Sequence, residues 1–310
     1  MHVRPYRSTI PAVGDVLTEL LELLQLERIE ADLFRGQSQD LGWGNVFGGQ
    51  VVGQALSAAA QTVPEERPVH SVHGYFLRTG DARRPIVYDV DRIRDGKSFT
   101  TRRVVAIQNG KAIFTMAASF QIEEDGFEHR APMPEAPGPD GLLSEIEIAR
   151  KYADRIPEPL REQALAARPI EVRPVEPVNV LRPKAMPPQR RVWYRTTGTL
   201  PDTPSVHRYL LAYASDFNLL GAAMQPHAVS WLNPDMQVAS LDHAIWFHRP
   251  FRMDQWLLYV IDSPSASGAR GLARGQFFTQ DGRLVASTAQ EGLLRRHPSR
   301  EGRGGASGEG

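Results

Sequence analysis

The sequence predicts an α+β protein of two similar halves, in each of which a helix is followed by antiparallel strands. Three observations support this fold class. In both halves, segments with helical apolar spacing precede segments rich in β-branched and aromatic residues. A dipeptide typical of tight hairpins joins the last two strands of each half, Asn109-Gly110 in the first and Asp281-Gly282 in the second. Short strings also recur in the same order along the chain.

The first half begins with two expected helices. In residues 15–26 apolar side chains recur with helical spacing, and Asp15 stands where an N-cap is expected. Residues 48–62 are rich in small side chains, and their glycines are poor helix formers. We therefore expect this helix to be buried where another backbone comes close. Four strands are expected after it, at residues 72–77, 85–93, 99–108 and 112–122.

Residues 131–190 differ from both halves, because they hold 12 of the 24 prolines. A short helix is expected at residues 142–153, between two proline-rich arms. We interpret the segment as a linker with local structure that connects two domains. The second half is then expected to contain a strand at 190–198, a helix at 206–222, and strands at 237–248, 256–262, 269–280 and 284–294.

The two halves can be aligned on each other. Residues 75–78 (YFLR) match 246–249 (WFHR), and the hairpin 108–111 (QNGK) matches 280–283 (QDGR). The interval between the two matched strings differs by one residue between the halves, as a single insertion in a loop would produce. An internal duplication is therefore the better explanation of the repeated pattern.

A long helix wrapped by a strongly curved antiparallel sheet is the hotdog fold. The duplication predicts a tandem (double) hotdog, in which two such sheets join into one layer and leave fewer exposed edge strands. The expected domains are an N-terminal hotdog at residues 1–130 and a C-terminal hotdog at 191–296. The linker at 131–190 separates them, and residues 297–310, rich in Gly, Ser, Arg and Glu, are expected to form a disordered tail.

The composition excludes several classes of protein. The 310 residues carry 36 Lys+Arg and 36 Asp+Glu, and a net charge of zero argues against nucleic-acid binding through a global positive field. The absence of cysteine rules out disulfides, thiolate metal sites and cysteine nucleophiles. The apolar runs fall below the roughly 18 residues of a membrane-spanning helix. Residues 1–11 lack the apolar core of a signal peptide, so we expect a cytoplasmic protein.

Several catalytic motifs are missing from the sequence. It contains no G-x-S-x-G nucleophile elbow, no G-x-x-x-x-G-K-[ST] phosphate loop and no H-E-x-x-H zinc motif. The nine histidines are scattered, and His243 and His248, five apart on an expected strand, should lie on opposite faces. We therefore expect no metal site and no cofactor. Gly48-Gly49 at a helix start could bind an anion, although close packing is the more common reason for glycine at such a place.

Seven collinear strings resemble the TesB-type acyl-CoA thioesterase II family, and the resemblance covers roughly residues 15–296. The strings are VFGGQVVGQAL (46–56), HSVHGYFLRTGD (70–81), RDGKSFTTRRVVAIQNGK (94–111), YASDFNLL (213–220), SLDHAIWFHRPF (240–251), SASGARGLARGQFFTQDGRLVAST (265–288) and AQEGLLR (289–295). The resemblance implies a double hotdog that hydrolyses acyl-CoA to free acid and CoA, without a metal and without an acyl-enzyme. Fatty acyl chains of medium to long length are the expected substrates.

The resemblance also implies three catalytic residues: Asp216 in YASDFN, Ser240 in ASLDHA and Gln290 in STAQEG. Asp216 would act as a partly desolvated base, since desolvation makes a carboxylate more basic. Ser240 and Gln290 would position the attacking water, and backbone N–H groups near a helix start would hold the oxyanion. In the aligned first half, Ala118 stands in the place of Gln290, and Asn45 lies near the place of Asp216. We therefore expect one site per chain, at the boundary between the halves.

Two other functions remain open at this stage. A hotdog enoyl-CoA hydratase resembles this pattern but has a histidine about five residues after its aspartate, where this sequence has Gly221. A non-catalytic acyl-CoA binder would not need the intact polar set. For CoA itself, Arg270 and Arg274 are candidate contacts on one face of a strand. We also expect assembly into a homodimer or homotetramer.

Overall fold

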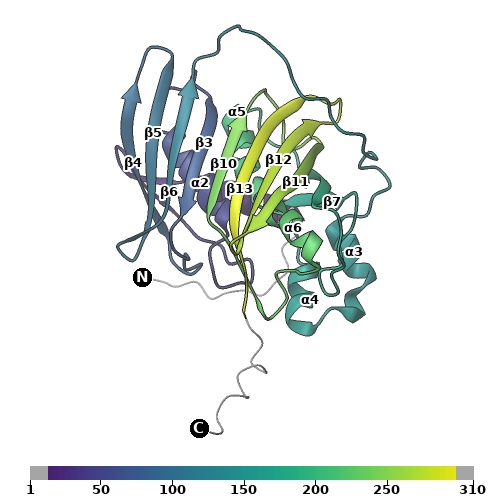
Figure 1. The fold of residues 1–310 in the computed structure, drawn as a ribbon. Coiled ribbons are helices and arrows are strands. Elements are labelled where there is room, and N and C mark those ends of the chain that lie inside the picture. The colour runs from purple at the N-terminus through teal and green to yellow at the C-terminus, as the bar shows by residue number, and fades with distance from the viewer. Residues whose placement is uncertain (1–12, 298–310) are drawn as a thin grey trace, which may run out of the picture.

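Thirteen strands form one continuous sheet in the computed structural model, which describes residues 13–297 (Figure 1). The first half supplies β1 (Glu27–Glu30), β2 (Leu33–Gly36), β3 (Val69–Phe76), β4 (Ile86–Asp95), β5 (Phe99–Gln108) and β6 (Lys111–Gln121). The second half supplies β7 (Ile170–Pro174), β8 (Gln189–Thr196), β9 (Met236–Ser240), β10 (Asp242–Phe247), β11 (Leu257–Ser267), β12 (Arg270–Thr279) and β13 (Leu284–Arg296).

The sheet is symmetric about its centre, where β3 pairs antiparallel with β10 and Val72 lies opposite Ile245. Outward from this joint the first half runs β3-β6-β5-β4 and the second half runs β10-β13-β12-β11. Corresponding strands therefore occupy corresponding places, and both predicted hairpins are present. The predicted double hotdog is confirmed, and the matching strand order of the halves agrees with the proposed internal duplication.

Two helices, α2 (Gly48–Ala60) and α5 (Pro204–Ser215), lie side by side on one face of the sheet, behind the strands in Figure 1. From Gly49 to Ala59 every residue of α2 is buried. A Cβ added to Gly49 would lie 2.2 Å from the backbone oxygen of Tyr213 in α5. The predicted close approach of a second backbone is confirmed, because only glycine fits at this contact.

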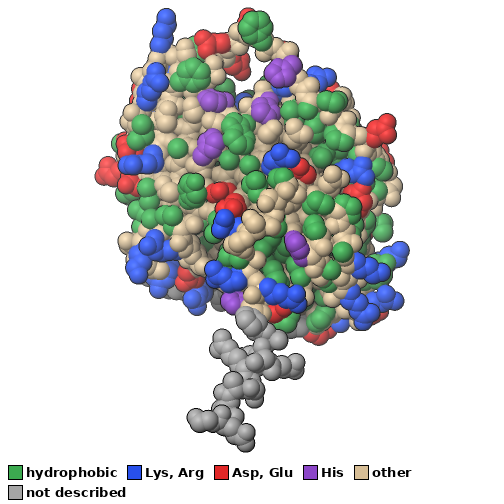
Figure 2. All heavy atoms as spheres, viewed as in Figure 1, with side chains coloured by type: hydrophobic (Ala, Val, Ile, Leu, Met, Phe, Trp, Pro, Cys, Tyr) green, Lys and Arg blue, Asp and Glu red, His purple; other side chains and the backbone are tan. Residues whose placement is uncertain are grey.

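The other face of the sheet is open to solvent (Figure 2). Figure 2 shows hydrophobic and histidine side chains over the middle of this face and most of the charged side chains towards its rim. At the joint, the exposed aromatic residues Tyr75 and Trp246 belong to β3 and β10, and the His73 and Trp246 rings meet edge to face at 5.1 Å.

Residues 131–190 contain more structure than the sequence suggested. The predicted helix is present as α3 (Glu145–Lys151), with Ser144 and Glu147 forming a capping box. A short 3₁₀ turn, η1 (Ala153–Arg155), and α4 (Glu158–Leu165) follow, and β7 then extends the sheet by pairing with β8. The division at residues 131 and 190 stays a prediction, and the expected tail lies, from residue 298 on, outside the described residues.

Some predicted element ends are wrong. The first helix, α1 (Val13–Leu24), begins before Asp15, so this residue lies inside the helix and is not its N-cap. The hairpin of β1 and β2 was not predicted. All four residues of β1 are exposed, so its sequence lacks the alternation of apolar and polar residues that indicates a strand. None of the described helices is long and apolar enough to cross a membrane.

The contact between α2 and α5 can be tested with Gly49→Ala. The added methyl group would overlap the backbone of Tyr213, which cannot move without separating the helices. We expect a loss of about 1–3 kcal/mol in the free energy of unfolding, as for other overpacked core positions. Denaturant unfolding measures it. Gly126→Ala is the control, because a Cβ there meets no atom within 4 Å, and equal stability of the two variants would contradict the interpretation.

Candidate active site

Three polar side chains far apart in the sequence meet at the boundary between the halves. Gln290 donates through Nε2 to Asp216 Oδ1 over 3.0 Å and to Ser240 Oγ over 2.8 Å. Ser240 Oγ donates to the same oxygen of Asp216 over 3.2 Å. The structure therefore brings together all three residues that the resemblance singled out.

Asp216 is placed by a break between two helices. The predicted helix at residues 206–222 is in fact α5, which ends at Ser215, and α6 (Leu219–Met224). Asn218 between them takes a left-handed conformation with φ of 66°, which Asn tolerates better than most residues. The carboxylate of Asp216 is half-buried and projects from a helix end instead of from a solvated helix face.

Ser240 is placed by a second break, since the predicted strand at 237–248 is divided into β9 and β10 at Leu241. The Leu241 N–H donates to the backbone oxygen of Glu291 in β13, and the Leu241 oxygen accepts from the Phe76 N–H in β3, each over 2.9 Å. Asp242 Oδ1 accepts a further bond from the Glu291 N–H. These bonds hold the end of β9 against β13, beside Gln290.

His243 belongs to the same cluster, although the sequence analysis missed it. Its Nδ1 lies 2.5 Å from Gln290 Oε1, and its Nε2 lies 2.8 Å from Ser215 Oγ. Burial lowers the pKa of His243 in spite of the opposing effect of the Asp216 and Asp242 carboxylates, so the ring is neutral. Its only sequence signal was its place within the SLDHA string. The prediction that His248 faces the other way is confirmed, because His248 is exposed and His243 is buried.

The second oxygen of Asp216 faces the start of α2 from the other half. A Cβ added to Gly48 would lie 2.6 Å from Asp216 Oδ2. Within the described residues, Oδ2 accepts no hydrogen bond, and the Gly48 and Gly49 N–H groups have no acceptor. The first amides of a helix have no partner inside the helix, and its dipole favours negative charge there. A free carboxylate oxygen and free N–H donors therefore lie next to each other.

Aromatic side chains surround this point. The Phe47 ring, just before α2, stacks on Phe217, just after Asp216, with ring centroids 4.1 Å apart. Tyr213 lies edge-on to both rings, and Phe76 lies against Gly48. The polar set is therefore bordered by an apolar wall built from both halves.

Other predicted site features fall elsewhere. Arg270 and Arg274 do share an exposed face of β12, but each is paired with a carboxylate, Glu291 and Asp262 respectively. In residues 13–297, no group of three or more His, Cys, Asp or Glu side chains is arranged to hold a metal ion.

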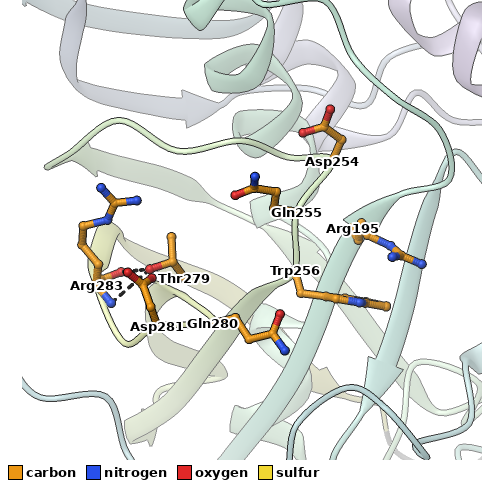
Figure 3. Close-up of a pocket in the computed structure, with 8 residues that line it drawn as sticks. All are labelled: Arg195, Asp254, Gln255, Trp256, Thr279, Gln280, Asp281 and Arg283. Carbon is orange, nitrogen blue, oxygen red and sulfur yellow. Dashed lines mark hydrogen bonds between the residues drawn. The ribbon is translucent and has the colours of Figure 1, made fainter.

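A pocket of about 460 Å³ lies at the turn between β12 and β13, away from the polar set (Figure 3). Its lining residues include Arg195, Trp256 and Arg283, and none of the polar set. Arg195 already pairs with Glu171 and stacks over the Trp256 ring at 4.4 Å. This pocket and the polar set therefore share no lining residue.

Comparison with known proteins shows the family to which the chain belongs. The family model described as acyl-CoA thioesterase matches residues 159–293, and the model of the acyl-CoA thioesterase N-terminal domain matches residues 38–121. Acyl-CoA thioesterase 2 of Haemophilus influenzae is 47% identical over 283 residues, which cover 91% of this chain and 99% of that protein. The chain belongs to the acyl-CoA thioesterase II family.

Relatives of this thioesterase extend across kingdoms. Human acyl-coenzyme A thioesterase 8 is 41% identical, with 92% of each chain covered. The crystal structure of TesB2, an acyl-CoA thioesterase II from Mycobacterium marinum, is 45% identical with a TM-score of 0.73, and covers 90% of this chain and 99% of its own. The protein is therefore an acyl-CoA hydrolase with the hotdog fold of its family.

The contact of Gly48 with Asp216 leads to a prediction for this thioesterase. In Gly48→Ala the new methyl group would push on Asp216 Oδ2, which is the movable end of a side chain. We expect normal folding but a kcat lower by about 10²-fold, the cost of a misplacement of about 1 Å in an active site. Steady-state hydrolysis and thermal unfolding, with Gly126→Ala as the control, measure both effects. An unchanged kcat would mean that Oδ2 is not used at this position.

Proposed function

We propose that Asp216, Ser240 and Gln290 catalyse the hydrolysis of fatty acyl-CoA by activating a water molecule for direct attack on the thioester carbonyl. The observation that carries this proposal is the different hydrogen bonding of the two carboxylate oxygens of Asp216. Its Oδ1 is held by two donors, whereas Oδ2 accepts no hydrogen bond from the residues that the structure describes and faces the start of α2. A carboxylate fixed through one oxygen can accept a proton through the other.

The proposed reaction has two steps and no covalent enzyme intermediate. In the first step the water oxygen bonds to the carbonyl carbon while one of its protons passes to Asp216 Oδ2. In the second step the C–S bond breaks, the carbonyl reforms, and the CoA sulfur takes the proton from Asp216. The products are a carboxylic acid and CoA thiol, and Asp216 is again a carboxylate.

The oxyanion of the tetrahedral intermediate would be stabilised by the N–H groups of Gly48 and Gly49. These donors have no acceptor among the described residues and lie at the positive end of α2. Because α2 and Asp216 come from different halves, the proposed site needs both hotdogs. This agrees with the expectation of one site per chain, since the first half has Ala118 where the second has Gln290.

Ser240 and Gln290 would act by holding Asp216, more than by holding the water as the sequence analysis expected. Gln290 donates one hydrogen bond to Asp216 Oδ1 and one to Ser240, and the Ser240 hydroxyl also donates to Asp216 Oδ1. They keep the carboxylate in one rotamer and leave Oδ2 as its basic oxygen.

A fatty acyl chain is the proposed substrate because the polar set is bordered by Phe47, Phe217, Tyr213 and Phe76. Such a wall favours an apolar group over a short polar one. A homo-oligomer, a cytoplasmic location and a role in fatty acid metabolism stay predictions from the sequence.

The base is tested with Asp216→Asn, which keeps the shape of the side chain but cannot take up the proton. We expect kcat to decrease by about 10²–10⁴-fold, the usual contribution of general-base catalysis. The measurement is release of CoA thiol from palmitoyl-CoA, followed with a thiol-reactive dye. Near-wild-type kcat in a folded Asp216→Asn protein would overturn the assignment. Intact enzyme that released no thiol from any acyl-CoA would instead favour the hydratase or the non-catalytic binder.

The two partners of Asp216 are tested side by side. Gln290→Ala removes three hydrogen bonds at once, those to Asp216, Ser240 and His243, and should lower kcat severely, by about 10²-fold. Ser240→Thr keeps the hydroxyl and should be mild, whereas Ser240→Ala should be intermediate with measurable turnover. Ser119→Ala is the matched control, because Ser119 lies on β6, the counterpart of β13, and its hydroxyl bonds to His70, outside the polar set. Complete loss in Ser240→Ala together with an acylated Ser240 detected by mass spectrometry would point to a serine nucleophile instead.

A further inference from the structure

We propose that His243 is a positioning residue of this thioesterase, whose Nδ1–H holds the Gln290 amide in the one orientation that can serve Asp216. The inference rests on the proposed function of Asp216 and extends it to a residue that does not touch the substrate. It is carried by a chain of hydrogen bonds that runs from Ser215 to His243, then to Gln290 and on to Asp216.

The orientation of the Gln290 amide matters because its two ends are chemically opposite. As observed, Nε2 donates both of its hydrogens, one to Asp216 and one to Ser240. A rotation of 180° would place Oε1 against the carboxylate, where two acceptors repel, and Asp216 would lose a donor. A donor on the far side of the amide would stabilise the observed orientation further, because it would bond to Oε1 only in that orientation. His243 Nδ1, 2.5 Å from Oε1, is the group in contact there.

The tautomer of His243 follows from the same bonds. A ring that donates from Nδ1 and is neutral has a lone pair on Nε2, and Ser215 Oγ lies 2.8 Å from it. Ser215 can also donate to the backbone oxygen of Ala212 at 3.0 Å, and then Nε2 would have no donor. Because burial lowers the pKa of His243 and keeps the ring neutral, the Ser215 proton belongs on the bond to Nε2.

The duplicated half shows that the fold itself does not need this polar pair. In the alignment of the halves His243 corresponds to Val72 and Gln290 to Ala118, and Val72 and Ala118 are cross-strand partners between β3 and β6, each 1% exposed. In the second half, β10 pairs with β13, and Ala244 lies opposite Ala289. The next residues along this antiparallel pair are His243 and Gln290, which take the places of Val72 and Ala118. A buried polar pair that replaces an apolar one in an identical setting indicates a role in the chemistry.

The test compares His243→Leu with His243→Asn by kcat, KM and thermal unfolding on palmitoyl-CoA. Leucine cannot donate, whereas the Asn amide nitrogen can stand where Nδ1 stands. We expect His243→Leu to lower kcat by about 10–100-fold with KM changed less than threefold, and His243→Asn to recover most of kcat. Val72→Ala is the control for core damage, since it should lower stability without the loss of kcat.

A double-mutant cycle shows whether His243 acts through Gln290. In a Gln290→Ala background, His243→Leu should have no further effect on kcat, because the amide to be oriented is gone. Wild-type kcat in His243→Leu, or an equal loss with and without Gln290, would overturn the inference. Should His243→Leu not fold, His243→Asn is compared with His243→Gln, whose amide reaches the Nε2 position instead. Asn must then be the faster enzyme, and equal or reversed rates would overturn the inference.

The outcomes also separate this inference from the proposed function. If Asp216→Asn is inactive but His243→Leu has wild-type kcat, only the role of His243 fails. If Asp216→Asn retains wild-type kcat, the proposed function fails, whatever the His243 variants do.

Discussion

The backbone contact between α2 and α5 is the constraint on which the site depends. Gly49 lies against the backbone of Tyr213, and no side chain larger than hydrogen fits between them. At this separation, the end of α5 reaches the start of α2, and Asp216 from one half comes to face Gly48 from the other. A wider spacing would keep both hotdogs but would move the carboxylate away from the free N–H groups. The same small residues that allow close packing therefore also set the position of Asp216 relative to the start of α2.

The buried polar set is tolerable to the fold because its members satisfy one another. Gln290 and His243 are almost fully buried, and an unpaired polar group at such a place costs about 1–3 kcal/mol. Here the amide uses its oxygen and both hydrogens, and the imidazole uses both nitrogens. Among the described residues, the acceptor of this set that is left without a hydrogen bond is Asp216 Oδ2, which faces the start of α2. A preorganised base requires one carboxylate oxygen that is held by hydrogen bonds and a second oxygen with a lone pair that can accept a proton.

The duplication separates what the fold needs from what the reaction needs. Corresponding strands in the two halves have the same order and pairing, yet the first half has Val72 and Ala118 where the second has His243 and Gln290. The first half instead contributes the start of α2 and Phe47. Each half thus supplies one component, and a single hotdog of this chain would have either the carboxylate or the helix start but not both. The proposed site therefore lies at the joint between the two copies and needs both of them.

The sequence by itself determined the alternation of helices and strands, the two hairpins, the duplication and, through resemblance, the residues Asp216, Ser240 and Gln290. These follow from local periodicity, turn chemistry and long matching strings, which are all readable along one chain. Only the tertiary structure decided where the second helix breaks, where the strand before Asp242 divides and which side chains contact Gln290. The physical reason is that these features depend on contacts between distant segments. His243 is 28 residues from Ser215 and 47 from Gln290 in the sequence. No local sequence pattern around a single buried histidine indicates which residues it will contact.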